Sequence, residues 1–118
     1  MLIVEAHDSH KDERRTLTAW EEDIQVVEVK HMIVTQDGVR LGGHKHPFRE
    51  KFVIARGDAM VETWSEKEGT KKQHLSAPQM AIFEPDEEHA LTCSKGTIII
   101  VFLLGKFSQQ NIIPATNL

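Results

Sequence analysis

The chain has 118 residues, of which 40% are hydrophobic and 27% charged, and this suits one domain that buries its own core. Its formal net charge of −4 argues against the clustered positive charge that binding to nucleic acid or an anionic membrane requires. The single cysteine, Cys93, excludes an intrachain disulfide, so we expect a reducing, cytoplasmic setting. The apolar run at 97–104 is far shorter than the ~20 residues of a membrane-spanning helix.

Residues 1–118 are predicted to form one all-β domain, with a polar N-terminal arm at 1–16. Beyond the arm, short runs rich in β-branched residues alternate with turn signals that contain glycine, proline or aspartate. Many short strands with this punctuation indicate an antiparallel sandwich or barrel. The expected strands, in chain order, are 17–20, 24–34, 39–46, 51–55, 59–64, 79–83, 89–93 and 97–104.

Two of these strands, 26–34 and 97–104, carry apolar residues on both faces. In a small barrel, one face of a strand fills the interior while the other face meets solvent. A second copy of the chain that covers the outer face would account for the two-sided pattern. We therefore expect a homodimer.

Two histidines one residue apart carry the main chemical signal of the sequence. Side chains alternate along a strand, so His44 and His46 project from one face, and the same parity places Arg40 and Glu50 there. Two imidazoles and a carboxylate suit divalent Fe, Mn, Zn or Ni. His89, at the start of a later strand, is the candidate fourth ligand. The histidine pair is also open to two other interpretations, a proton-transfer pair or solvent-facing side chains.

Two further side chains on the expected strands have a predicted orientation. His31 lies in phase with Val29 and Ile33, so we expect it to face inward. In that position it is either a satisfied core group or a partner of the other histidines. Lys51 alternates to the face opposite Glu50 and is expected to lie in solvent.

The spacing of one segment resembles the first motif of the cupin superfamily. The segment reads G-x5-H-x-H-x3-E-x6-G and matches that motif at Gly38, His44, His46, Glu50 and Gly57. The second cupin motif is degenerate here: Pro85 and His89 are present, but its internal glycine and its asparagine are missing. The resemblance covers roughly residues 38 to 104. It implies a double-stranded β-helix, or jelly roll, in which His44, His46, Glu50 and His89 hold a divalent metal at the barrel mouth.

A weaker resemblance points to one group within the cupins. The stretches DERRTL (12–17) and GVRLGGHKH (38–46) are similar to the opening of small cupins that isomerise or epimerise keto-sugar nucleotides. This likeness implies that Arg40 binds an anionic group of a sugar substrate and that His44 and His46 transfer a proton. An inward His31 is a second candidate for contact with the substrate. Those enzymes generally work without a metal and lack a carboxylate such as Glu50, so the two resemblances favour different roles for the same histidines.

Three functions follow from these patterns. The favoured one is an isomerase or epimerase that acts on a carbohydrate or sugar nucleotide. The alternatives are an Fe-dependent dioxygenase, which a set of three histidines and one carboxylate also suits, and a non-catalytic cupin that binds a small molecule.

Overall fold

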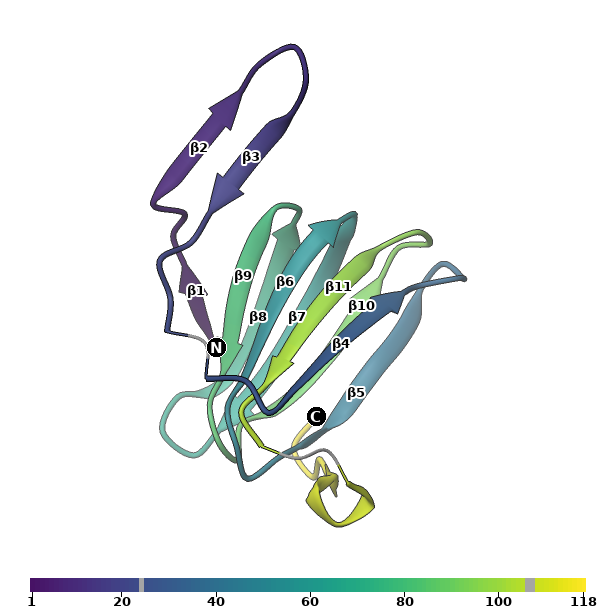
Figure 1. The fold of residues 1–118 in the computed structure, drawn as a ribbon. Coiled ribbons are helices and arrows are strands. Elements are labelled where there is room, and N and C mark those ends of the chain that lie inside the picture. Colours follow the sequence, from purple (N-terminus) through teal and green to yellow (C-terminus); the bar gives the residue numbers. More distant parts are fainter. Residues whose placement is uncertain (24, 106–107) are drawn as a thin grey trace.

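Short β-branched runs pair into two five-stranded antiparallel sheets that lie face to face in this computed structural model (Figure 1). The structure describes residues 1–23, 25–105 and 108–118. The first sheet has the order β1-β9-β6-β11-β4, with the bounds Leu2–Val4, Gln79–Phe83, Glu50–Arg56, Ile98–Leu103 and Glu28–Ile33. The second sheet has the order β12-β5-β10-β7-β8, with the bounds Ile113–Pro114, Val39–Lys45, Glu88–Cys93, Asp58–Ser65 and Gly69–Ser76.

Outside the two sheets, the N-terminal part of the chain forms a hairpin of β2 (Asp8–Lys11) and β3 (Thr16–Ala19), which projects beyond the sheets (Figure 1). The side chains of β2 are exposed, in keeping with their polar sequence. A short 3-10 turn, η1, spans Gln109–Asn111 near the other end of the chain. Among the described residues, no helix has the length and apolar character needed to cross a membrane.

The core fills the space between the inner faces of the two sheets. Phe52 and Ile54 of β6 belong to one buried cluster with Val61 of β7 and Leu91 of β10. Alternate residues in part of each strand enter this cluster, which is the alternation that sheet packing requires. Gly57 turns the chain between β6 and β7 with a φ of +83°, which glycine adopts without steric penalty. The predicted all-β, antiparallel class is confirmed.

Strand β4 forms the edge of the first sheet, and its phase is opposite to the predicted one. Lys30 and Met32 point into the space between the sheets, whereas His31 lies exposed on the outer face with Val29 and Ile33. The predicted inward orientation of His31 is therefore wrong. Both phases of this strand contain apolar residues, so the hydrophobic pattern did not determine which face is buried.

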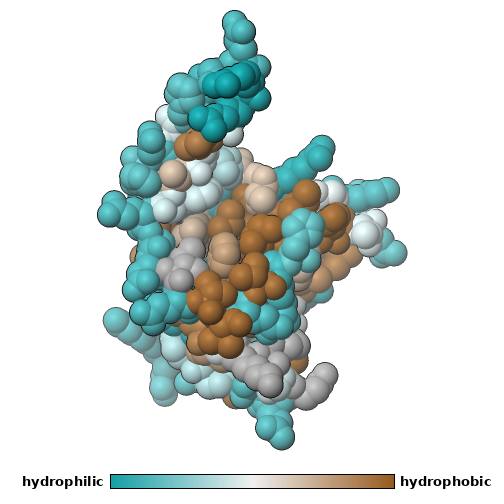
Figure 2. Space-filling model, viewed as in Figure 1, coloured by the Kyte–Doolittle hydropathy of each residue, from teal (hydrophilic) through white to brown (hydrophobic). Residues whose placement is uncertain are grey.

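The outer face of the first sheet is apolar where β11 and β4 lie. Figure 2 shows hydrophobic residues gathered over these two strands. On and just before β4, the exposed fractions of Val27, Val29 and Ile33 are 62%, 56% and 57%. We refer to these three residues as the β4 patch. An exposed apolar edge of this kind is a typical site of contact with another protein surface.

The bounds of two elements differ from the predicted ones. The expected strand at 24–34 begins at Glu28 in the structure, and residue 24 lies outside the described residues. Strand β8 was not among the expected strands, because its sequence GTKKQHLS lacks an alternating apolar pattern. It is the edge strand of the second sheet and most of its side chains are exposed, so nothing in its pattern marks a buried face.

Candidate active site and metal centre

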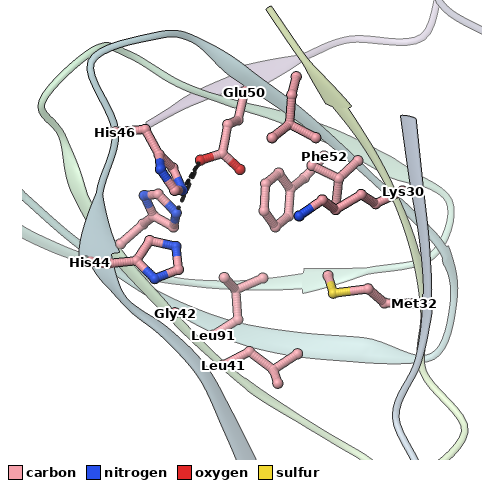
Figure 3. A pocket seen from close by; sticks show the side chains of 12 residues that line it. Lys30, Met32, Leu41, Gly42, His44, His46, Glu50, Phe52 and Leu91 are labelled. Carbon is pink, nitrogen blue, oxygen red and sulfur yellow. Dashed lines mark ion pairs between the residues drawn. The ribbon is translucent and has the colours of Figure 1, made fainter. Parts of the chain in front are cut away.

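Three strands bring the four predicted ligands together in the space between the sheets. His44 lies near the end of β5 directly opposite His89 of β10, and Glu50 begins β6. Figure 3 shows His44 and His46, from β5 and the residue just after it, pointing toward Glu50 of β6. One ligand atom from each of the four residues lies within 4.8 Å of all the others. These separations are near the ~4 Å expected between ligands on opposite sides of one ion.

A β-bulge in β5 determines which side chains reach this cluster. Opposite β10, Ala90 pairs with Gly42 and His89 pairs with His44, so Gly43 is an extra residue in β5. Gly42 and Gly43 have φ values of +82° and +75°, which glycine adopts without steric penalty. A Cβ atom at Gly42 would lie 2.7 Å from the carbonyl oxygen of His89. The two glycines thus permit the inserted residue, which reverses the alternation of side chains along β5.

Arg40 faces away from the cluster, contrary to prediction. Its side chain is exposed, whereas its neighbours Val39 and Leu41 are half-buried and Leu41 lines the pocket. The parity that connected Arg40 with His44 assumed an uninterrupted strand, and the bulge breaks that parity. His31 lies on the outer face of β4, so neither of the two predicted substrate-binding residues reaches the pocket.

Backbone carbonyls determine which ring nitrogen of two histidines carries the proton. The Nδ1–H of His46 donates to the carbonyl of Asn111 at 2.6 Å, and the Nδ1–H of His89 donates to the carbonyl of Glu87 at 3.1 Å. A carbonyl can only accept, so in the neutral rings the Nε2 atoms carry lone pairs. These atoms face one carboxylate oxygen, Oε1 of Glu50, at 2.9 Å from His46 and 3.5 Å from His89.

The oxygen at the centre of this group is not satisfied by the protein. Oε1 of Glu50 is buried and receives no well-directed hydrogen bond from the described residues, although two imidazole nitrogens lie close to it. A buried carboxylate without a compensating positive charge is strongly unfavourable. Either a cation or a proton shared with an imidazole must therefore accompany Glu50.

The three imidazoles respond differently to this environment. Burial, together with the nearby His89 and His46, lowers the pKa of His44 to about 4. Burial also lowers the pKa of His89, despite the opposing effect of Glu50. For His46, burial alone would lower the pKa, but the contact with Glu50 and the hydrogen bond to Asn111 outweigh it and raise the pKa. His44 and His89 are thus neutral near pH 7, as ligands must be, and His46 is the imidazole best able to hold a proton.

Apolar side chains enclose the cluster and restrict the access of water. Phe83 stacks on the ring of His89 with centroids 4.5 Å apart, and Phe48 stacks on His46 at 5.0 Å. The pocket beside the cluster has a volume of about 230 Å³. Its walls come largely from aliphatic and aromatic side chains of both sheets, which strengthen electrostatic interactions inside it.

Sequence reasoning missed two groups that contribute to this site. Lys30 lines the pocket, and Figure 3 shows its side chain directed into the cavity from β4. Both phases of β4 contain apolar residues, so the alternation of this strand does not by itself identify Lys30 as inward. The carbonyl of Asn111 fixes the ring of His46, and no sequence signal identifies a backbone carbonyl 65 residues away.

The arrangement fits a divalent metal ion. Three imidazole nitrogens and one carboxylate oxygen form a donor set that suits Fe, Mn, Zn or Ni. Two of the imidazoles donate a hydrogen bond from Nδ1–H to a backbone carbonyl, which is the usual support of a metal-binding histidine. The unsatisfied oxygen of Glu50 lies among these nitrogens. His44, His46, Glu50 and His89 can therefore hold an ion without rearrangement of the fold.

Comparison with known proteins finds similarity in structure alone. No family model and no curated protein matches the sequence. The sugar 3,4-ketoisomerase QdtA from Thermoanaerobacterium thermosaccharolyticum, in complex with TDP, superimposes with a TM-score of 0.79 at 15% identity, over 98% of this chain and 88% of that one. A 3,4-ketoisomerase from Helicobacter canadensis gives 0.79 at 17% identity, over 95% and 88%.

An epimerase has a similar structure as well. The RmlC epimerase from Mycobacterium tuberculosis gives a TM-score of 0.74 at 14% identity, over 95% of this chain and 72% of that one. At such low identity the likeness establishes the arrangement of strands and not the chemistry. Because these neighbours are cupins, the jelly roll implied by the motif at residues 38–57 is confirmed. The chain has the fold of the cupin superfamily, as in these ketoisomerases and this epimerase.

Proposed function

We propose that this chain is a carbohydrate isomerase or epimerase that moves a proton at a carbon next to a sugar carbonyl. The observation that carries the proposal is the apolar pocket in which three imidazoles surround the unsatisfied carboxylate oxygen of Glu50. Groups of this kind can transfer protons or stabilise the negative charge that forms when the C–H bond breaks. The names of the similar structures, 3,4-ketoisomerases and an epimerase, support the same reaction class.

The proposal includes a divalent ion held by His44, His46, Glu50 and His89. Such an ion, when bound, supplies a Lewis acid that polarises the substrate carbonyl and makes the neighbouring C–H more acidic. With these four residues engaged as ligands, Lys30 is the remaining titratable side chain among the described residues that line the pocket. We assign to its ammonium group the stabilisation of negative charge on the substrate. It takes the place of Arg40, which the sequence suggested for this role.

A metal-free reaction is the second candidate, and the contact between His46 and Glu50 favours it. Nε2 of His46 lies 2.9 Å from Oε1 of Glu50, and the pKa of His46 is raised. In this reaction a neutral His46 would take the proton from one carbon, Glu50 would stabilise the resulting imidazolium, and the imidazolium would return the proton to the next carbon. The same ring cannot bind a metal through Nε2 while it shuttles a proton, so the two candidates exclude each other.

The size of the pocket limits the part of a substrate that it encloses. Its volume of about 230 Å³ is below the roughly 300–1,000 Å³ of sites that enclose a drug-sized ligand. One sugar ring suits this space, whereas a whole sugar nucleotide does not. We infer that the ring enters the pocket and that any nucleotide stays at its mouth.

Deuterium exchange tests the proposed reaction directly. We expect the purified chain, incubated in D2O with TDP-4-keto-6-deoxyglucose, the ligand of one ketoisomerase complex, to incorporate deuterium at the carbons that flank the keto group. Proton NMR measures the uptake. A variant with His44→Asn and His46→Asn should show no exchange, and elemental analysis should find no bound metal. The control variant His31→Asn, on the outer face, should retain both the exchange and the metal.

Each outcome of this experiment distinguishes the candidates. Exchange that stops after treatment with a chelator and returns with one of the four metals supports the metal-assisted reaction. Exchange that survives chelation supports proton transfer by His46. Absence of exchange with every keto sugar tested contradicts an isomerase; oxygen uptake with bound iron would then favour a dioxygenase, and binding without turnover a non-catalytic cupin.

We further infer that the chain forms a homodimer through the β4 patch and that it acts in the cytoplasm. The three exposed aliphatic residues of the patch lie on one open sheet edge, where a second copy could cover them. Light scattering should give the mass of a dimer for the wild type and of a monomer for Val29→Asp. A monomeric wild type would contradict the dimer. The buried free thiol of Cys93 supports the location, and detection of the protein outside the cell would refute it.

A further inference from the structure

The C-terminal segment 111–117 contacts the candidate centre at three separate points. The carbonyl of Asn111 accepts a hydrogen bond from Nδ1 of His46 at 2.6 Å. Strand β12 then pairs with His44 and Lys45 of β5, and the amide of Ala115 donates to the carbonyl of Gly43, the inserted residue of the bulge, at 2.9 Å. The segment therefore contacts both the ring of one predicted ligand and the backbone that carries another.

Glu88 fastens the end of this segment to β10. Its side chain is 1% exposed, and it directly precedes His89 in the sequence. Oε1 accepts hydrogen bonds from the amides of Thr116 at 2.9 Å and Asn117 at 2.8 Å, and Oε2 accepts one from the side-chain amide of Asn117 at 2.8 Å. Three donors on one buried carboxylate form a strong, charge-assisted clamp.

We propose that Glu88 and the segment 111–117 are a positioning device for His46, fastened at Glu88 and acting through the carbonyl of Asn111. The carbonyl selects the tautomer in which Nδ1 carries the proton, so that Nε2 of His46 presents its lone pair to the cluster. Because side chains alternate along β10, His89 points to the candidate centre, and its neighbour Glu88 points to the opposite face, where it binds the segment.

Binding at the centre and docking of the segment are coupled as a result. A metal ion requires the tautomer that the docked segment selects, so each stabilises the other by the same factor. The coupling rests on the proposed metal site, whereas the positioning of His46 does not. The tautomer can be measured in the metal-free protein, and this separates failure of the inference from failure of the proposed function.

Two variants of the full chain loosen the segment from different sides. Glu88→Gln removes the charge of the clamp, and Ala115→Pro removes the amide that donates to Gly43 without altering β10. The matched control is Glu62→Gln on the neighbouring strand β7, since the carboxylate of Glu62 makes no hydrogen bond or ion pair with the described residues. Using both variants guards against a misfolded protein or a direct effect on His89.

The expected results are specific to positioning. Nitrogen-15 NMR at a pH high enough for His46 to be neutral should find the Nδ1–H tautomer of His46 in the wild type and in Glu62→Gln, and a tautomer mixture in both test variants. Calorimetric titration with Ni²⁺ should give an affinity about 10-fold weaker in the test variants, the usual effect of removing an outer support of a ligand. Ni²⁺ should also slow hydrogen exchange of the Thr116 and Asn117 amides by a similar factor in the wild type.

A structural role alone would give a different pattern. In that case the melting temperature of the test variants falls while the tautomer of His46 stays unchanged, and this result overturns the proposal. If the wild type binds no Ni²⁺, the metal site is refuted. If the Nδ1–H tautomer of His46 is nevertheless present in the wild type and lost in both variants, the positioning of His46 remains supported.

Discussion

Strand β6 carries two charged side chains that are both almost completely buried, and they lie on opposite faces of the first sheet. Glu50, 4% exposed, points into the pocket, whereas Lys51, 1% exposed, points to the outer face. The ammonium of Lys51 donates to Oε1 of Glu22 at 2.7 Å and to the carbonyl of Asp23. Oε1 of Glu50 has two imidazole nitrogens nearby but no well-directed donor among the described residues.

This difference separates a structural charge from a functional one. The segment that contains Glu22 and Asp23 covers Lys51 and supplies the partners that its burial requires. The groups around Glu50 are imidazole nitrogens that, like the carboxylate itself, accept hydrogen bonds. The negative charge of Glu50 therefore contributes little to folding, but it favours the binding of a cation or a proton. Substitutions on the two faces of β6 should therefore affect different properties of the protein.

The largest effect is expected for Glu50→Gln. The amide removes the negative charge among the proposed ligands, so the affinity for Mn²⁺ or Ni²⁺ should fall by at least roughly 100-fold. This exceeds the effect expected when only a hydrogen-bond partner of a ligand is lost. The melting temperature of the metal-free protein should stay the same or rise, because an uncompensated buried charge is gone. Calorimetric titration and thermal unfolding measure the two properties. Full metal affinity in this variant would exclude Glu50 as a ligand.

A smaller effect of a different kind is expected for Lys51→Met. The substitution keeps the length of the side chain but leaves the partners in the covering segment without their donor, which should lower the free energy of unfolding by about 2 kcal/mol. Urea denaturation measures this loss. Metal affinity should match that of the wild type, so a variant with normal stability and weak metal binding would reverse the assignment of the two faces.

The smallest effect concerns the pH dependence of the metal-free protein. In the folded protein the pKa of His44 is lowered to about 4, and the pKa of His89 is lowered as well. Both lie below the ~6.5 of an unfolded histidine. Between these values the unfolded chain binds more protons, so stability should fall as the pH drops from 6.5 toward 4. His46 has the opposite sign: its raised pKa adds stability at low pH that is lost as the pH rises through the folded-state value.

A variant isolates the contribution of one imidazole to this acid sensitivity. His44→Asn should lose less stability than the wild type between pH 6.5 and 4.5, because one of the groups that resist protonation is gone. Urea midpoints at several pH values provide the comparison, and the carboxylates, which titrate in both proteins, cancel in the difference. Parallel curves for the two proteins would show that His44 is not shielded in the way its burial suggests.

Along β5, the sequence predicted the orientation of side chains correctly after the bulge and incorrectly before it. The spacing from Gly38 to Gly57 indicated the jelly roll and singled out three side chains, and His89 on a later strand was the candidate fourth ligand. The structure brings one ligand atom of each of the four within 4.8 Å of the others. Parity failed for Arg40 because the bulge at Gly43 lies between it and the histidines. The adjacent glycines at 42 and 43 were the available signal for that bulge.

Other differences between expectation and structure have causes that are distant in the sequence. Both phases of β4 are partly apolar, and burial by the opposite sheet decides that His31 faces outward. Lys51 was expected in solvent, but residues 22–23, which no local pattern connects with β6, cover it. The carbonyl of Asn111 could not be foreseen either, because its role depends on where the last segment of the chain docks.

The extra residue in β5 has a consequence for how such a centre can be gained or lost in descent. Because Gly43 alone shifts the frame of β5, removing a single codon would exchange the faces of the residues that follow it, so that His44 would turn outward and Lys45 inward. Among related sequences, the presence of this centre should then follow the presence of the inserted residue and not a substitution. A structure of the variant that lacks Gly43 would show whether the frame shifts as expected or whether the strand absorbs the deletion elsewhere.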